Sequence, residues 1–183
     1  MITVNITQEE KTRCLNFANT IITGGNQFDR FNKSLDTQIS RTYIGKLAEY
    51  IFLHFLQSRN ITATETDMFE IFNGAENADS FDFLLPNGES IDIKTASLSF
   101  HKRIMIPISQ WHLRKDYYVG IKLNFKTNTN ITDPNNIETA TIFGYIDRAT
   151  LENQQMQNFG EGDCKAYPLK DLLDIETLIK LYG

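Results

Sequence analysis

Apolar residues recur at helical spacing over the first third of the chain and at strand spacing over the middle. Thr7 and Glu10 have the spacing of a capping box, so a helix is expected from there to about residue 22. A second, longer helix is expected to begin within 34–37 and to end at about Ser58. It is apolar on most sides, which predicts that it is buried.

One side of the second helix is polar. Gln38, Thr42, Gly45 and Glu49 follow one another at spacings of four, three and four, so they stack along one line of the helix. This line places the carboxylate of Glu49 within the most apolar stretch of the chain. A carboxylate there needs a cation or hydrogen-bond donors as partners.

Strand-like periodicity begins at about residue 61. Strands are expected over 61–66, 68–72, 81–85, 91–95, 117–125 and 139–146, a short helix over 109–115, and further helices over 148–155 and 169–181. This order indicates an α/β protein with a central mixed β-sheet flanked by helices. The 183 residues are expected to form a single domain, with an N-terminal helical region 1–36, a core 37–146 and a C-terminal helical region 147–183.

A three-residue turn at 86–88 (Pro-Asn-Gly) predicts a hairpin between two of these strands. Its register puts Asp82 opposite Asp92, with Lys94 on the same face, while the other face is apolar and carries Phe81, Phe83, Ile91 and Ile93. Two carboxylates directly opposite each other repel, unless one is protonated or both share a cation. Oxygen ligands of this kind suit Mg²⁺, and we expect Mn²⁺ to substitute. Lys94 would then lie beside the metal, where it could polarise a phosphate oxygen or help deprotonate a water.

Asp82, a hairpin and then Asp92-Ile93-Lys94 together resemble the PD-(D/E)XK nuclease superfamily, whose members have a restriction-endonuclease-like core. The helix around Glu49 resembles the first core helix of that family, and the resemblance covers about residues 37–125 in order. It implies that Asp82 and Asp92 bind Mg²⁺, that the Ile93 carbonyl contributes, that Glu49 joins directly or through water, and that Lys94 is catalytic. The proline that often precedes the first aspartate is absent, since Phe81 stands there.

Candidate nucleic-acid contacts lie on both sides of this segment. They are Arg41 and Lys46 on the second helix, and His101, Lys102, Arg103 and Gln110 after the hairpin. Solvated loop and helix surfaces are the alternative explanation for each of them. The net charge of −5 counts against a nucleic-acid binder, although a local basic patch can coexist with an acidic remainder.

These observations predict a metal-dependent endodeoxyribonuclease of the restriction or mobile-element type, acting on double-stranded DNA as a homodimer. The alternatives are a catalytically silent nucleic-acid-binding module on the same fold, and a structural or interaction protein with a solvated hairpin face. No apolar run reaches membrane-spanning length, and no secretory signal is visible at the N-terminus. Cys14 and Cys164 are therefore expected to be reduced thiols in a cytoplasmic protein.

Overall fold

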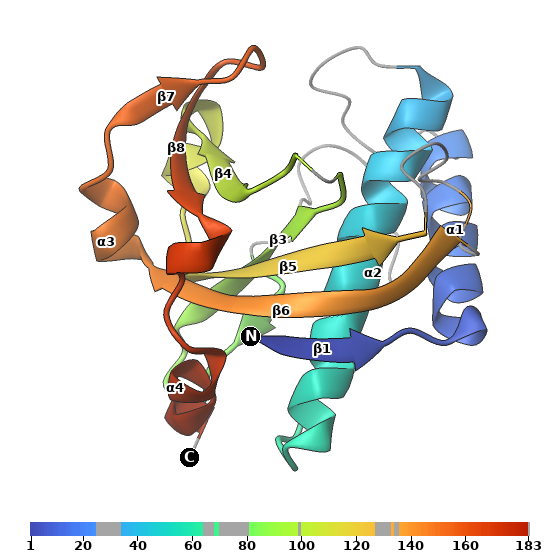
Figure 1. Cartoon of the computed structure of the whole chain (residues 1–183), viewed down its shortest axis with the longest axis horizontal. Helices are drawn as coiled ribbons and strands as arrows, with labels where there is room; N and C mark the ends of the chain where they lie inside the picture. Colours follow the sequence, from blue (N-terminus) through green and yellow to red (C-terminus); the bar gives the residue numbers. More distant parts are fainter. Residues whose placement is uncertain are drawn as a thin grey trace.

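The chain folds into a mixed α/β structure with a curled five-stranded sheet, helices beside it and a second, three-stranded sheet (Figure 1). The computed structural model describes residues 1–24, 34–63, 68–69, 81–98, 100–126, 133 and 136–182. The predicted class of a mixed sheet with flanking helices is confirmed at this level. Among the described residues, no helix has the length and hydropathy needed to span a bilayer.

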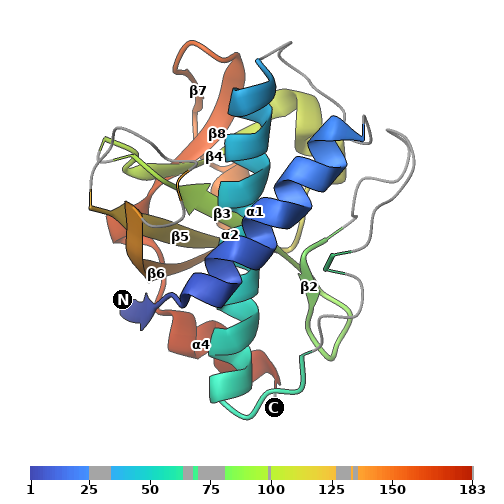
Figure 2. The same ribbon diagram turned by 90° about the vertical axis from the view of Figure 1, so that its right-hand side faces the viewer.

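Helices α1 (Gln8–Thr23) and α2 (Leu35–Ser58) cross each other over one face of the large sheet (Figure 2). The predicted capping box is present at α1, where the Thr7 hydroxyl accepts the Glu10 amide at 3.2 Å and the Glu10 carboxylate accepts the Thr7 amide. Ser34 caps α2. Both helices therefore begin where the sequence predicts, because their starts are fixed by local hydrogen bonds.

The large sheet has the strand order β1-β6-β5-β3-β2. Its strands are β1 (Ile2–Asn5), β2 (Phe83–Leu84), β3 (Ser90–Ala96), β5 (Tyr117–Phe125) and β6 (Ile137–Asp147). Neighbouring strands are antiparallel except for β3 and β5, which are parallel. Strand β3, which carries the predicted metal-binding residues, is thus held between an edge hairpin strand and an interior strand.

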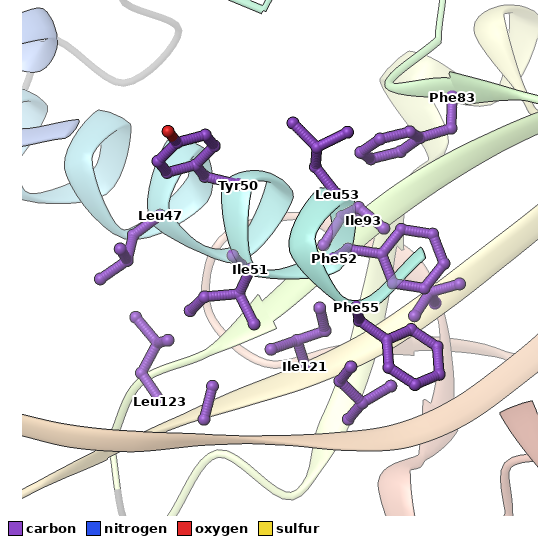
Figure 3. Close-up of a cluster of buried hydrophobic side chains, with 14 of the residues drawn as sticks. Leu47, Tyr50, Ile51, Phe52, Leu53, Phe55, Phe83, Ile93, Ile121 and Leu123 are labelled. Atoms are coloured by element: carbon purple, nitrogen blue, oxygen red, sulfur yellow. The ribbon is translucent and has the colours of Figure 1, made fainter. Parts of the chain in front are cut away.

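The main core lies between α2 and the large sheet. Figure 3 shows Leu47, Ile51 and Phe55 of α2 facing Ile121 and Leu123 of β5, and all five side chains are buried. Apolar residues that repeat every three or four positions on a helix meet alternate residues on the strands. This packing fixes α2 against β3 and β5, and so fixes the position of Glu49 relative to the hairpin.

A second sheet covers part of the opposite face. It consists of β4 (Arg103–Pro107), β8 (Asp163–Pro168) and β7 (Met156–Asn158), in the order β4-β8-β7. A 3-10 helix, η2 (Ile108–Leu113), follows β4 at the site of the predicted short helix. Ala96, Ile104, Tyr118 and Leu169 belong to the buried cluster beneath this sheet.

The two terminal regions differ from the prediction of all-helical segments. Region 1–36 contains the edge strand β1, which pairs with β6. Region 147–183 contains β7 and β8, and its first helix is only α3 (Arg148–Glu152). The helix expected over 169–181 is divided into η4 (Leu169–Asp171), α4 (Ile175–Ile179) and η5 (Lys180–Tyr182).

The C-terminal helix is interrupted because Leu173 pairs with β6. The Leu173 amide donates to the Tyr145 carbonyl at 2.8 Å, and the Tyr145 amide donates back at 3.0 Å. Backbone bonds to a strand are incompatible with the helical ladder at the same residue. The strands expected over 61–66 and 68–72 fall largely outside the described residues, and their described parts, 61–63 and 68–69, hold no strand.

The close approach of Leu173 to β6 depends on Gly144. Gly144 has a φ of +148°, and a Cβ there would lie 2.0 Å from the Leu173 carbonyl oxygen. We expect Gly144→Ala to lower the free energy of unfolding by about 2–4 kcal/mol, because the strained backbone and the clash add up. Urea denaturation measures this change through the transition midpoint.

Gly45→Ala is the matched control for that prediction. Gly45 lies within α2, and no heavy atom of the described residues comes within 4 Å of a Cβ built there. Alanine in a helix interior is more stable than glycine by about 0.5–1 kcal/mol, so this variant should unfold at a higher urea concentration. Equal destabilisation of the two variants would show that Gly144 has no special steric role.

Candidate metal centre

The β2–β3 hairpin has the turn that the sequence predicts. Gly88 has a φ of +85°, and the Leu85 amide donates to the Glu89 carbonyl at 2.8 Å across the turn. Phe83 lies opposite Ile91 in the ladder, as expected. A left-handed glycine at this position closes a three-residue loop, so the register was set by local geometry.

The open end of the hairpin departs from the prediction at Asp82. The ladder stops at Phe83, the Asp82 amide donates to the Ile91 carbonyl at 3.0 Å, and the Asp82 carboxylate accepts the Ile93 amide at 2.6 Å. The side chain of Asp82 thus replaces a backbone acceptor at the sheet edge. Phe81 lies beyond this point and is 38% exposed. The prediction that it packs on the apolar face with Phe83 was therefore wrong.

Asp92 and Lys94 share one face of β3, as the alternation predicts. Ile91 and Ile93 are buried on the other face, and the Lys94 ammonium forms an ion pair with the Asp92 carboxylate. Both charged side chains are partly buried, with 18% of Asp92 and 27% of Lys94 exposed. The pair is therefore less screened than an ion pair on an open surface.

Glu49 reaches the same region from α2. Its carboxylate lies 2.5 Å from the Lys46 ammonium, and both side chains are largely buried. The Lys46 ammonium also lies 5.4 Å from the centre of the Phe17 ring of α1. Lys46 is thus the cationic partner that a carboxylate in this apolar stretch requires. It contacts Glu49 and the α1–α2 interface, away from the open surface expected of a phosphate ligand.

The charges of these residues act on one another. The pKa of Asp82 is raised well above its ordinary value, first by burial, then by the negative charges of Glu49 and Asp92, against the Ile93 amide and Lys94, which lower it. Among the described residues, the Lys46 ammonium pairs with Glu49 and the Lys94 ammonium pairs with Asp92, whereas the Asp82 carboxylate accepts a backbone amide. A proton or a bound cation at Asp82 relieves the repulsion among these carboxylates.

The donor chemistry of the cluster fits magnesium. Carboxylate oxygens of Asp82, Asp92 and Glu49 are hard ligands of the kind Mg²⁺ prefers. The N–H and C=O of one strand residue point to the same side, so the Ile93 carbonyl faces the edge where its amide meets Asp82. In the described residues, no three His, Cys, Asp or Glu side chains are grouped as metal ligands. Metal binding therefore requires Asp92 and Glu49 to turn away from their lysines.

The predicted nucleic-acid contacts lie in different settings. Arg41 is exposed near the start of α2, and Lys102 and Arg103 are exposed at the start of β4. His101 serves the turn after β3, because its Nδ1 accepts the amides of Ser97 and Leu98 at 3.3 Å each. Gln110 is half-buried in η2.

Two residues, Lys46 and Glu161, have roles that the sequence did not predict. Lys46 precedes Glu49 by three positions, a spacing that brings side chains together on a helix and could have identified the pair. Glu161 lies in the β7–β8 hairpin, 120 residues further along the chain than Arg41. Its carboxylate forms an ion pair with the Arg41 guanidinium at 2.7 Å. No local pattern in the sequence predicts that contact.

Comparison of the chain with family models, with curated proteins and with solved structures found no match.

The raised pKa of Asp82 predicts that the free energy of unfolding depends on pH. Its ionisation is harder in the folded state, so the folded protein binds the proton more tightly and its stability falls as pH rises. The loss begins at about the ordinary value of 3.8 and continues through the raised folded pKa. Asp82→Asn keeps an oxygen acceptor for the Ile93 amide but removes the charge.

We therefore expect Asp82→Asn to be more stable than wild type at neutral pH in EDTA, with a difference that shrinks toward pH 4. Free energies of unfolding measured across this range in both proteins give the difference directly. Magnesium should close the gap by stabilising only the wild type. A difference that stays constant with pH would contradict the raised pKa.

Proposed function

We propose that this chain is a magnesium-dependent endodeoxyribonuclease with a restriction-endonuclease-like core. The observation that carries the proposal is the edge of the β2–β3 hairpin, where the partly buried Asp82 carboxylate accepts the Ile93 amide next to the Asp92–Lys94 ion pair. The negative charges of Glu49 and Asp92 both act on Asp82.

The order of elements supports the proposed core. Helix α2 comes first, then the β2–β3 hairpin, then β4, η2 and β5. Apart from β4, this is the order on which the resemblance to the PD-(D/E)XK superfamily rests. β5 lies beside β3 and runs parallel to it. These neighbours hold the Asp92-Ile93-Lys94 segment on a rigid interior strand, as a site that positions a phosphate requires.

In the proposed reaction, water adds to the phosphorus of a DNA phosphodiester and one bridging P–O bond breaks. When bound, magnesium would lower the pKa of a coordinated water and offset charge on the phosphate. Asp82, Asp92, the Ile93 carbonyl and Glu49, directly or through water, would hold it. Lys94 would either donate a hydrogen bond to a phosphate oxygen or take a proton from the attacking water.

The direct test is incubation with Mg²⁺ of supercoiled plasmid and of genomic DNA, which offers many sequences. Wild type, Asp82→Asn and Lys94→Met are compared with EDTA controls. We expect nicking or linearisation by the wild type alone. Equal cutting by all three proteins would refute the site, and no cutting of either DNA by the wild type would favour a silent binding module.

A two-fold symmetric pair of copies places one site at each strand of a duplex, so we infer that the active form on double-stranded DNA is a homodimer. Sedimentation of the protein with and without a DNA duplex tests this inference. A cytoplasmic location stays a prediction of the sequence.

A further inference from the structure

Helix α2 shows a single accessible line beside the candidate centre. Between Arg41 and Tyr50, every residue is buried except Arg41, Thr42, Gly45 and Glu49. Arg41, Gly45 and Glu49 are four residues apart, so they stack on the same side of the helix. Arg41 lies eight residues from Glu49, which is about 12 Å along the axis at 1.5 Å per residue.

The middle of this line is open. Apart from the two chain neighbours of Gly45 and the backbone of α2 around it, no heavy atom of the described residues comes within 4 Å of the position that a Cβ on Gly45 would occupy. Glycine in a helix interior is costly, and its presence here leaves room for another chain to approach the helix backbone. The line therefore runs from Glu49 at one end to Arg41 at the other, and no side chain of the described residues covers the Cβ position of Gly45 between them.

Arg41 is held by the β7–β8 hairpin. Its guanidinium lies 2.7 Å from the Glu161 carboxylate, and about half of each side chain is exposed. In Figures 1 and 2 the hairpin tip and the first turns of α2 reach the same end of the molecule. The Arg41–Glu161 contact therefore lies at the end of the accessible line that is farther from Glu49.

The hairpin tip has a defined shape. Glu161 lies between Gly160 and Gly162, whose φ angles are +98° and +97°. The Asn158 side chain accepts the Gly160 amide and donates to the Asp163 carboxylate, both at 2.9 Å. These bonds hold the tight turn, so Glu161 is presented to Arg41 by a formed loop.

The hairpin also carries a second cation close by. The Arg103 guanidinium lies 5.6 Å from the centre of the Phe159 ring, and Phe159 is 50% exposed. Arg103 comes from β4, the neighbour of β8 in the second sheet. A cationic group thus lies near Glu161 in addition to Arg41, and a guanidinium is suited to bind a nucleic-acid phosphate.

We propose that the Arg41–Glu161 ion pair is a latch that DNA opens, with a backbone phosphate taking the place of the Glu161 carboxylate on Arg41. The planar guanidinium matches carboxylate and phosphate equally well. An exposed ion pair is weak, so Glu161 lowers DNA affinity without blocking it. This inference rests on the proposed function only in that the ligand is double-stranded DNA.

The test measures binding of a fluorescein-labelled DNA duplex by anisotropy in EDTA at about 50 mM salt, where no metal-dependent cleavage occurs. We expect Glu161→Gln to bind about two- to fivefold more tightly than wild type. We expect Arg41→Gln to bind about three- to tenfold more weakly, with the dependence of log Kd on log salt reduced by about 0.9. In the Arg41→Gln background, Glu161→Gln should change the affinity for DNA little, because Glu161 affects DNA binding through Arg41.

Glu176→Gln is the matched control. Glu176 forms an ion pair with Arg59 at the other end of α2, with similar exposure of both side chains, and its loss changes the net charge by the same amount. We expect this variant to bind DNA within about a factor of 1.5 of wild type, because distant charges are screened.

Three outcomes would overturn the latch. They are equal tightening by Glu161→Gln and Glu176→Gln, tightening by Glu161→Gln that persists without Arg41, and no measurable DNA binding by wild type or Glu161→Gln. A parallel cleavage assay with Mg²⁺ separates this result from the nuclease proposal. If Glu161→Gln tightens DNA binding only when Arg41 is present and no DNA is cut, the latch is supported and the nuclease proposal is refuted. If DNA is cut but the effect of Glu161→Gln does not depend on Arg41, the nuclease is supported and the latch is refuted.

Discussion

Lys94→Met is expected to slow Mg²⁺-dependent DNA cleavage by about 10²–10⁴-fold, the range for loss of a group that transfers or stabilises a proton. Methionine keeps most of the packing of the lysine chain but removes the ammonium that contacts Asp92. The carboxylates remain in place, so the variant should still bind Mn²⁺. Initial rates of plasmid nicking and a Mn²⁺ titration measure the two properties separately.

Lys126→Met is the control for this prediction. Lys126 also forms an ion pair, with Glu138 on the same sheet. Lys94 lies beside Gly120 of β5, and Lys126 is six residues further along, about 20 Å at the rise of a strand. Its cleavage rate should stay within about a factor of two of wild type. Equal rates for Lys94→Met and wild type would exclude Lys94 from the chemistry.

Asp92→Asn is expected to weaken Mn²⁺ binding by more than about 100-fold and to reduce cleavage at least as much, because a direct ligand matters more than the outer groups around a metal. The substitution also removes one of the charges that raise the pKa of Asp82. Asp82 should therefore titrate at a lower pH in this variant. Calorimetric titration with Mn²⁺ and the pH dependence of unfolding measure both effects.

Glu89→Gln provides the matched control for Asp92→Asn. Glu89 lies at the turn of the same hairpin, where its carboxylate contacts Asn87 and Tyr117. Its loss should leave Mn²⁺ affinity unchanged within error. If Asp92→Asn retained wild-type affinity, the metal centre would have to lie elsewhere in the chain.

The parts of the fold that the sequence predicted well are those fixed by neighbours in the chain. The capping box at Thr7, the cap at Ser34 and the glycine turn at Gly88 each depend on groups within a few residues. The register of the β2–β3 hairpin follows from its turn. The face shared by Asp92 and Lys94 follows from strand alternation.

The parts that were missed depend on partners far away in the chain. Strand β1 exists because it pairs with β6, and β4 pairs with β8 some 60 residues later. The C-terminal apolar pattern is typical of a helix, but the bonds between Leu173 and Tyr145 interrupt it. Propensity and periodicity cannot reveal such pairings, because tertiary contacts override them.

The arrangement of the candidate centre differs from the one that the sequence predicted. The expected pair of Asp82 and Asp92 across the ladder does not form, because the Asp82 carboxylate takes the Ile93 amide at the sheet edge. Repulsion is instead shared with Glu49, and Lys46 and Lys94 each neutralise one carboxylate. Composition and spacing can list such groups, whereas their mutual orientation depends on how α2 packs on the sheet.

The most direct measurement is anomalous diffraction from crystals of the wild-type protein soaked in Mn²⁺. We expect a manganese peak among the carboxylates of Asp82 and Asp92 and the carbonyl of Ile93, with the Lys94 ammonium turned away from Asp92. A crystal at saturating Mn²⁺ with no peak there, and with Asp92 still bound to Lys94, would contradict the proposed metal centre.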